Sequence, residues 1–210
     1  PFFPFALVVL LVWSVWCGDH VLLVPAVAVG SAVVQSHVSY VPLVAVLVGT
    51  AVAVVAVTSR RDEAARRALA WSAAAGVLVW LPPLADQLWG TGNLGDLLDY
   101  LLHPTEPKAG WSAAFRIFGA QLHPVGAWIT GDDLSAAGFS RTRSSGPAWI
   151  TVAALVGVTA WAHRRHQRDP ARLGAVVLLA IAVGLWASAN ITGLVVPYLF
   201  RWWWVVAGLA

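Results

Sequence analysis

Residues 21–58 contain no Asp, Glu, Lys or Arg, and this uncharged apolar stretch constrains the fold more than any other feature of the chain. A helix needs about 20 mainly apolar residues to cross the hydrocarbon core of a bilayer, so the stretch is too long for one span. It breaks at residues 35–37, just before Pro42, which predicts two antiparallel membrane helices. The chain is 59% hydrophobic and 11% charged, whereas soluble domains are about 25% charged. This composition excludes a soluble globular enzyme and predicts an integral membrane protein of the all-α class.

Further apolar runs bring the predicted number of membrane helices to about seven. They cover residues 2–17, 68–84, 148–162, 173–189 and 195–210. The run at 68–84 is expected to end at Pro82 and Pro83, because proline interrupts a helix. The chain contains no Met, so we expect residues 1–210 to be a single transmembrane domain from a longer polypeptide. The predicted fold is a polytopic transmembrane helix bundle.

Arginines cluster in two loops, and we expect both loops to lie on the cytoplasmic side of a membrane. Residues 59–67 and residues 163–172 each carry four arginines. Positive charge in short loops is typical of the cytoplasmic side. Residues 86–146 then form an extracytoplasmic loop. The bias toward Val, Ala and Leu suggests a GC-rich bacterial genome, so we expect a multi-pass protein of the bacterial plasma membrane.

Two amphipathic segments in the loop of residues 86–146 predict helices that lie along the outer membrane surface. In residues 93–103, leucines recur at helical spacing and Asn93 is expected to cap the helix. In residues 111–122, large apolar side chains are spaced by four, three and four residues. Both segments are too short to cross a bilayer, which favours an interfacial position.

Polar side chains gather at the expected outer ends of the membrane helices, and they predict an outward-facing polar cavity. A polar group at membrane depth is costly, so each one needs a partner or a functional role. The residues predicted to line the cavity and to bind substrate are Gln35, His37, Asp86, Gln87 and Arg201.

Each of these residues also has a purely structural interpretation. Gln35 and His37 could hydrogen-bond the backbone that Pro42 leaves unpaired. Asp86 could be a solvated loop carboxylate that follows the proline pair. Arg201 is followed by three tryptophans, and it could extend to lipid headgroups beside an aromatic belt of Trp202–Trp204.

The sequence contains no motif that assigns a chemical reaction. It has no phosphate-binding Walker loop, dinucleotide glycine fingerprint, zinc-ligand spacing or nucleophile elbow. The catalytic residues are therefore unknown, and no metal site or cofactor is evident. The net charge of +3 comes from arginines beside apolar runs, which are topology signals. We therefore expect membrane lipid as a partner and no nucleic acid.

Three blocks resemble a known group of membrane proteins. The blocks are GSAVVQSHVSYVP at residues 30–42, WLPPLADQLWGTGNLGDLLDYLL at residues 80–102 and PYLFRWWWVV at residues 197–206. They are similar to the central and C-terminal parts of large multi-pass proteins of GC-rich bacteria that are regarded as GT-C-type glycosyltransferases. The resemblance implies transfer of a sugar from a polyprenyl-phosphate donor on the extracytoplasmic face. It also implies that Arg201 faces the donor phosphate, because a guanidinium suits phosphate oxygens.

The same resemblance implies a catalytic region that this chain does not contain. In GT-C-type enzymes, an acidic residue in the first outer loop serves as the catalytic base or as a metal partner. That loop would precede Pro1, so a divalent cation is expected only with the full-length protein. Two other functions stay open, a transporter or flippase-like protein and a non-catalytic membrane scaffold.

Overall fold

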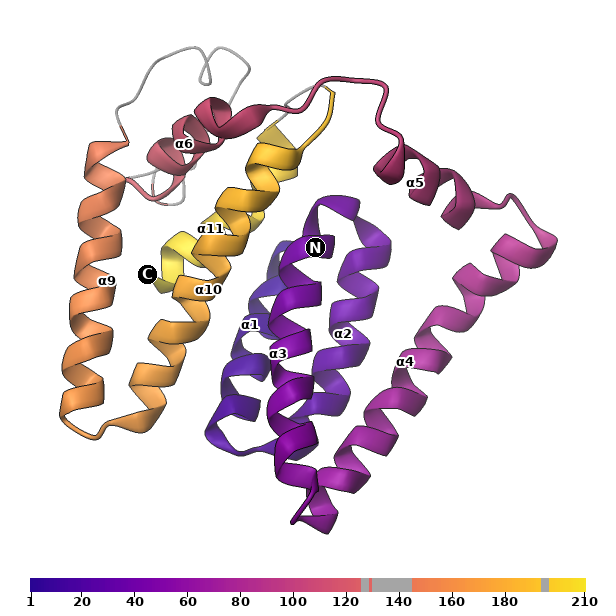
Figure 1. Cartoon of the computed structure of the whole chain (residues 1–210), viewed down its shortest axis with the longest axis horizontal. Coiled ribbons are helices and arrows are strands. Elements are labelled where there is room, and N and C mark those ends of the chain that lie inside the picture. The colour runs from indigo at the N-terminus through magenta and orange to yellow at the C-terminus, as the bar shows by residue number, and fades with distance from the viewer. Residues whose placement is uncertain (126–128, 130–144, 194–196) are drawn as a thin grey trace.

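The computed structural model describes residues 1–125, 129, 145–193 and 197–210, and these residues form an all-helical protein (Figure 1). Among them are nine α-helices and no β-strand. The long elements of the bundle are α1 (Phe2–Cys17), α2 (Leu23–Ser36), α3 (Val41–Ser59), α4 (Glu63–Trp89), α9 (Gly146–Arg164) and α10 (Arg168–Asn190). The short helices are α5 (Asn93–Leu102), α6 (Gly110–Gln121) and α11 (Trp202–Leu209), and the 3-10 turns are η1 (His20–Leu22), η2 (Val38–Tyr40) and η3 (Pro197–Phe200).

Three of the described segments are long and apolar enough to cross a membrane. They are Val38–Ser59, Glu63–Trp89 and Arg168–Asn190. The apolar segments Phe2–Cys17 and His20–Ser36 are shorter. The all-α class is thus confirmed for the described residues, and the three segments support a membrane protein. The larger number of seven membrane helices is not confirmed.

The two arginine-rich loops lie at the same end of the bundle. Residues 60–62 connect α3 to α4 and residues 165–167 connect α9 to α10, so the segments 59–67 and 163–172 comprise these turns and the adjoining helix ends. Both turns lie at the bottom of Figure 1. We call this the arginine end, and we call the opposite end, where α5 and α6 lie, the pocket end. This arrangement is the one that a shared cytoplasmic location of the two loops requires.

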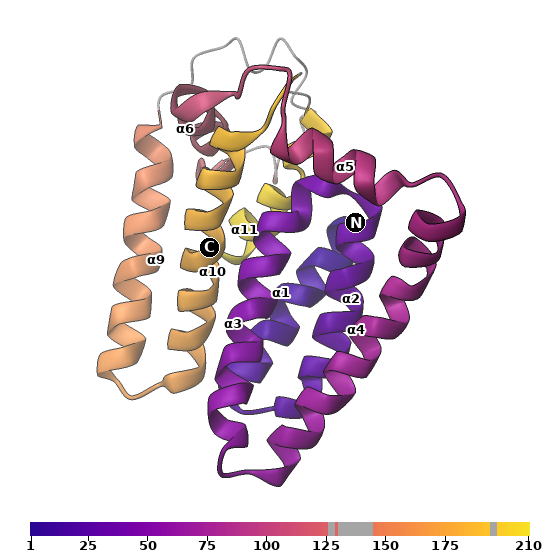
Figure 2. The same ribbon diagram turned by 45° about the vertical axis from the view of Figure 1, so that its right-hand side comes forward.

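Helix α4 does not end at its proline pair, which corrects the sequence-based boundary. It runs from Glu63 to Trp89 with Pro82 and Pro83 inside it. In Figures 1 and 2 it leans away from the other helices toward the pocket end. Proline removes a backbone N–H and leaves a carbonyl unpaired, so an interior proline is tolerated where another group satisfies that carbonyl. The side chain of Gln35 in α2 is such a group.

The amphipathic segments of the long loop are helices, as predicted, and neither is long enough to span a bilayer. Helix α5 has no buried side chain, whereas α6 buries residues that include Ile117 and Phe118. The cap of α5 differs from the prediction, because Asn93 is the first helical residue and Gly92 takes the capping position. The side chain of Gln87, in α4, accepts the hydrogen bond from the first turn of α5 that a capping side chain would otherwise accept. Within the loop, residues 126–128 and 130–144 lie outside the described residues.

The last predicted membrane helix is interrupted. Residues 194–196 lie outside the described residues, η3 follows them, and α11 covers only Trp202–Leu209. Eight residues of helix extend about 12 Å, too little for the hydrocarbon core of a bilayer. Trp202 and Trp203 are 0% exposed and stack with their ring centroids 4.8 Å apart. Their packing draws this segment into the bundle, beside α1 and α10.

Candidate functional site at the pocket end

Gln35 satisfies a backbone carbonyl that the proline pair leaves unpaired. In a regular helix the N–H of residue 83 would donate to the carbonyl of residue 79, but Pro83 has no N–H. The side-chain amide of Gln35 donates to that carbonyl oxygen of Val79 over 3.1 Å. One residue further, Trp80 Nε1 donates to Ser31 Oγ over 3.2 Å. These two bonds join α2 to α4 beside the interruption, so Gln35 has a structural role there, although at Pro83 and not at Pro42.

His37 holds the turn between α2 and α3. Its Nδ1 accepts a hydrogen bond from the backbone N–H of Ser39 over 3.2 Å, which caps η2. Burial lowers the pKa of His37, so the ring is neutral near pH 7 and Nδ1 has a lone pair for this bond. The ring also contacts Tyr198 edge-on, with centroids 5.6 Å apart. His37 therefore lies between the start of α3 and η3.

Asp86 and Gln87 build the corner between α4 and α5. The carboxylate of Asp86 accepts from the backbone N–H of Thr91 over 3.1 Å and from its hydroxyl over 2.8 Å. Gln87 Oε1 accepts from the N–H of Gly95 over 2.7 Å. That N–H is one of the unpaired donors in the first turn of α5, so Gln87 replaces the capping side chain that Gly92 lacks. Both residues thus have partners that fix the direction of α5.

Arg201 is exposed and precedes α11 directly. Its positive charge acts on the phenol of Tyr40, which is buried against Phe5. The alternative of a lipid-facing belt formed by three tryptophans is wrong for Trp202 and Trp203, because both are buried. Arg201 thus lies within electrostatic range of the turn that carries His37 and Tyr40.

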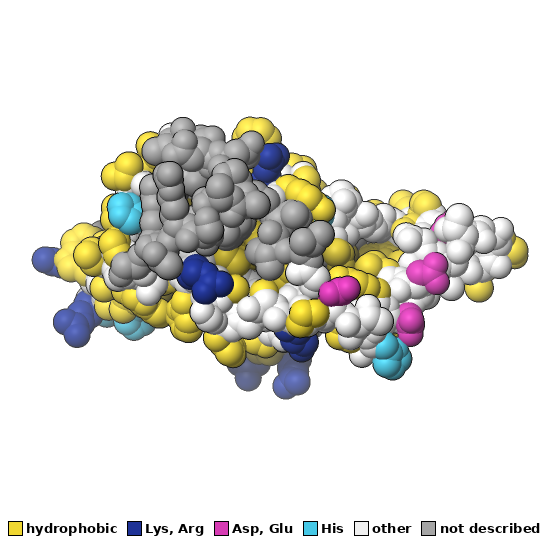
Figure 3. Space-filling view, turned by 90° about the horizontal axis from the view of Figure 1, so that it is seen from above, with side chains coloured by type: hydrophobic (Ala, Val, Ile, Leu, Met, Phe, Trp, Pro, Cys, Tyr) yellow, Lys and Arg dark blue, Asp and Glu magenta, His cyan; other side chains and the backbone are white. Residues whose placement is uncertain are grey.

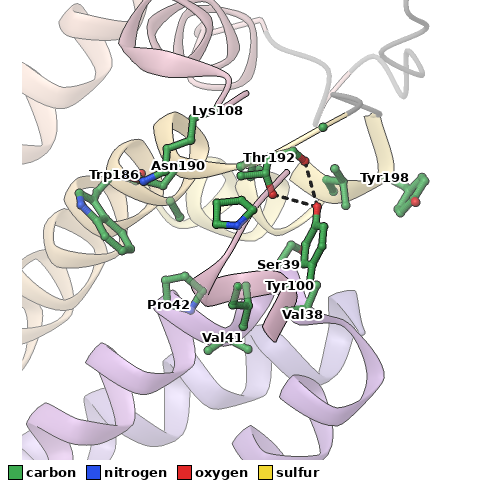
Figure 4. A pocket seen from close by; sticks show the side chains of 16 residues that line it. Val38, Ser39, Val41, Pro42, Tyr100, Lys108, Trp186, Asn190, Thr192 and Tyr198 are labelled. Atoms are coloured by element: carbon green, nitrogen blue, oxygen red, sulfur yellow. Dashed lines mark hydrogen bonds between the residues drawn. The ribbon is translucent and has the colours of Figure 1, made fainter. Parts of the chain in front are cut away.

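A pocket of about 560 Å³ opens at the pocket end (Figure 4). The start of α3 forms its floor, the end of α5 forms one wall, and the end of α10 with η3 forms the opposite wall. Its apolar lining residues include Val38, Val41, Pro42, Leu101, Trp186 and Leu199. Its polar lining residues are Ser39, Tyr100, Lys108, Asn190, Thr192 and Tyr198. The pocket is thus mainly apolar, with a small set of polar groups.

The pocket depends on two segments that are distant in sequence. The N–H of Ala109 donates to the carbonyl of Ile191 over 2.8 Å, and the N–H of Gly193 donates to the carbonyl of Pro107 over 3.3 Å. This pairing of residues 107–109 with residues 191–193 brings Lys108 to the end of α10, where its Nζ donates to Asn190 Oδ1 over 3.0 Å. Asn190 is neutral, so the ammonium charge is not cancelled by its partner.

Lys108 is the one charged side chain among the described residues that line the pocket. The acidic side chains of α5, Asp96 and Asp99, are exposed and lie outside the lining. Figure 3 shows acidic side chains on the α5 side of this end of the molecule. Within the described part of the chain, no group of three or more His, Cys, Asp or Glu side chains is placed to hold a metal ion.

The pocket is built from residues other than the five predicted ones. None of the five lines the pocket, which excludes Gln35, His37, Asp86, Gln87 and Arg201. The first four support the elements around it through hydrogen bonds. Of these, His37 comes nearest through its contact with Tyr198, which does line the pocket. One feature of the sequence points to the pocket. Lys108 is the only lysine of the chain, and it lies in the predicted outer loop.

The chain matches no known family model, and comparison with curated proteins and with solved structures also finds no match. The similarity to GT-C-type glycosyltransferases therefore stays a prediction from the three sequence blocks.

Proposed function

We propose that this chain is the lipid-substrate module of a GT-C-type glycosyltransferase that uses a polyprenyl-phosphate-linked sugar. The observation that carries the proposal is the pocket at the pocket end, in which one cation, Lys108, lies among mainly apolar walls. An amphiphile with an anionic head matches this combination, because the ammonium can pair with a phosphate and the walls can cover hydrocarbon.

The pocket favours a lipid-linked phosphate over a free polar substrate. Apolar lining such as Val41 and Leu199 gains free energy by covering hydrocarbon, about 25 cal/mol for each Å² removed from water. The tyrosines at residues 100 and 198 have an apolar ring and a polar hydroxyl, as amphiphile sites require. The pocket also lies at the end of two candidate membrane segments, Val38–Ser59 and Arg168–Asn190, where a lipid headgroup would be found.

Replacement of the lysine tests this function. We expect Lys108→Gln to weaken the binding of farnesyl phosphate, a short polyprenyl phosphate, by about tenfold, because a charge-assisted hydrogen bond is lost. Lys108→Arg keeps the charge and should retain most of the affinity. Calorimetric titration of the purified chain in detergent micelles measures the dissociation constants.

The matched control is Arg116→Gln, which removes a cation on α6 whose Nη1 donates to Ser112 Oγ and which does not line the pocket. It should leave the affinity for farnesyl phosphate unchanged. Neutral farnesol should bind equally to the wild type and to Lys108→Gln, and inorganic phosphate should bind weakly to both. Equal affinity of wild type and Lys108→Gln for farnesyl phosphate would contradict the proposal.

The proposal includes an orientation, with the arginine end in the bacterial cytoplasm and the pocket end outside as part of a multi-pass protein. We expect Glu63→Cys, at the arginine end, to resist a membrane-impermeant maleimide in intact cells when Cys17 is replaced by Ser. Asp96→Cys, on exposed α5, should react under the same conditions. Mass-shift labelling detects both, and reaction of residue 63 from outside would reverse the orientation.

A further inference from the structure

Helix α5 is attached to the rest of the protein differently from the other helices around the pocket. None of its side chains is buried, and it packs chiefly against α4. Leu98 and Leu102 are 58% and 65% exposed. Elements with few buried apolar contacts open at low cost in free energy. Even so, α5 contributes Tyr100 and Leu101 to the wall of the pocket.

Both ends of the segment that contains α5 are fixed by hydrogen bonds. At the first end, Gln87 and Asp86 hold the corner with α4. At the second end, residues 107–109 pair with residues 191–193. Gly92 lies in the first corner with φ of +74°, a conformation that glycine adopts without strain. The first anchor includes the first turn of α5, so the part of the helix that carries Tyr100 and Leu101 lies between the two anchors.

One residue in the middle of this segment ties α5 to the opposite wall of the pocket. The hydroxyl of Tyr100 donates to the carbonyl oxygen of Thr192 over 3.3 Å. The same hydroxyl oxygen accepts from Thr192 Oγ1 over 2.8 Å. Figure 4 shows both bonds crossing from α5 to the segment that follows α10. The side chain of Tyr100 is 44% exposed, so these two bonds, more than burial, hold it in place.

We infer that α5 is a gate over the pocket and that the Tyr100–Thr192 pair is the latch that keeps it closed. When both bonds break, α5 swings away between its two anchors and opens the wall formed by Tyr100 and Leu101. An amphiphile can then enter from the side of α5. The gate would regulate access to the proposed lipid site. The identity of the ligand rests on the proposed function, but the motion of α5 does not depend on which ligand binds.

Chemical access to the pocket floor measures the motion directly. Ser39 lines the pocket and is partly buried, and Ser39→Cys in a Cys17→Ser background gives a near-isosteric thiol there. We expect Tyr100→Phe, which removes both latch bonds, to increase the rate of N-ethylmaleimide labelling at this thiol about five- to thirtyfold. Thr192→Val keeps the bond to the carbonyl and removes the other, so its increase should be smaller.

Tyr198→Phe is the matched control, because it removes a second hydroxyl from the pocket lining without changing the latch. Its labelling rate should equal that of the parent protein. If Tyr100→Phe fails to fold, Thr192→Val alone must still label faster than Tyr198→Phe. Equal rates in all the proteins would overturn the gate. This result would be distinguishable from failure of the proposed function, since the labelling requires no lipid or sugar.

Discussion

We expect Gly184→Ala to destabilise the protein by about 1–3 kcal/mol, the range typical of overpacked cores. Gly184 lies in α10 against the stacked tryptophans of α11. A Cβ at residue 184 would lie 2.5 Å from Cζ3 and 2.8 Å from Cη2 of Trp202. The ring of Trp202 cannot yield easily, because it is 0% exposed and stacks on Trp203. The loss should outweigh the gain of about 1 kcal/mol in helix propensity when Gly is replaced by Ala.

Two other glycines in long helices provide controls for the same change. A Cβ at Gly49 of α3 or at Gly157 of α9 would meet no atom within 4 Å. Gly49→Ala and Gly157→Ala should therefore leave stability unchanged or raise it by up to about 1 kcal/mol. Thermal unfolding in detergent micelles, followed by circular dichroism, compares the three variants. A melting temperature of Gly184→Ala at or above that of the controls would show that α11 does not pack on α10 in this way.

Patterns of apolar residues along the sequence predicted the helices, because the spacing within one helix depends only on the residues of that helix. The leucine spacing of residues 93–103 and the aromatic spacing of residues 111–122 gave α5 and α6 to within one or two residues. Long uncharged runs gave α3 and α10. The predicted end of a helix was wrong where a residue distant in the sequence determines whether the helix continues. Helix α4 continues through Pro83 because Gln35 supplies a donor, and no pattern near Pro83 shows that.

The candidate site also depends on contacts between residues that are distant in the sequence. Polar residues near the ends of the predicted helices indicate the end of the bundle where the pocket lies, and Asn190 is among the residues that line it. The pocket itself depends on the pairing of residues 107–109 with residues 191–193, which no spacing along the sequence reveals. The sequence predicts Asp86 and Gln87 as substrate ligands, because a polar group near a membrane needs a partner or a functional role. Their partners include backbone N–H groups of the next turn and helix, so a structural role accounts for them.

Gln35→Leu should lower the free energy of unfolding by about 1–2 kcal/mol. The substitution leaves the Val79 carbonyl without the donor that now lies 3.1 Å away, and an unpaired carbonyl near the hydrocarbon region is costly. Leucine has a similar size, so changes in packing between α2 and α4 should be small. Chemical unfolding of the purified chain in micelles gives the free energies of the wild type and the variant.

The proline provides a decisive test of this explanation, because Pro83→Ala restores the missing N–H. In a Pro83→Ala background the backbone itself can donate to Val79, so the cost of Gln35→Leu should fall below about 0.5 kcal/mol. Gln87→Leu removes a different bond, from the N–H of Gly95, and its cost should be the same in both backgrounds. If Gln35→Leu costs the same in the wild-type and Pro83→Ala backgrounds, Gln35 stabilises the protein by some route other than the proline-freed carbonyl. Coupling confined to Gln35 would instead show that a glutamine of α2 permits a proline pair inside α4.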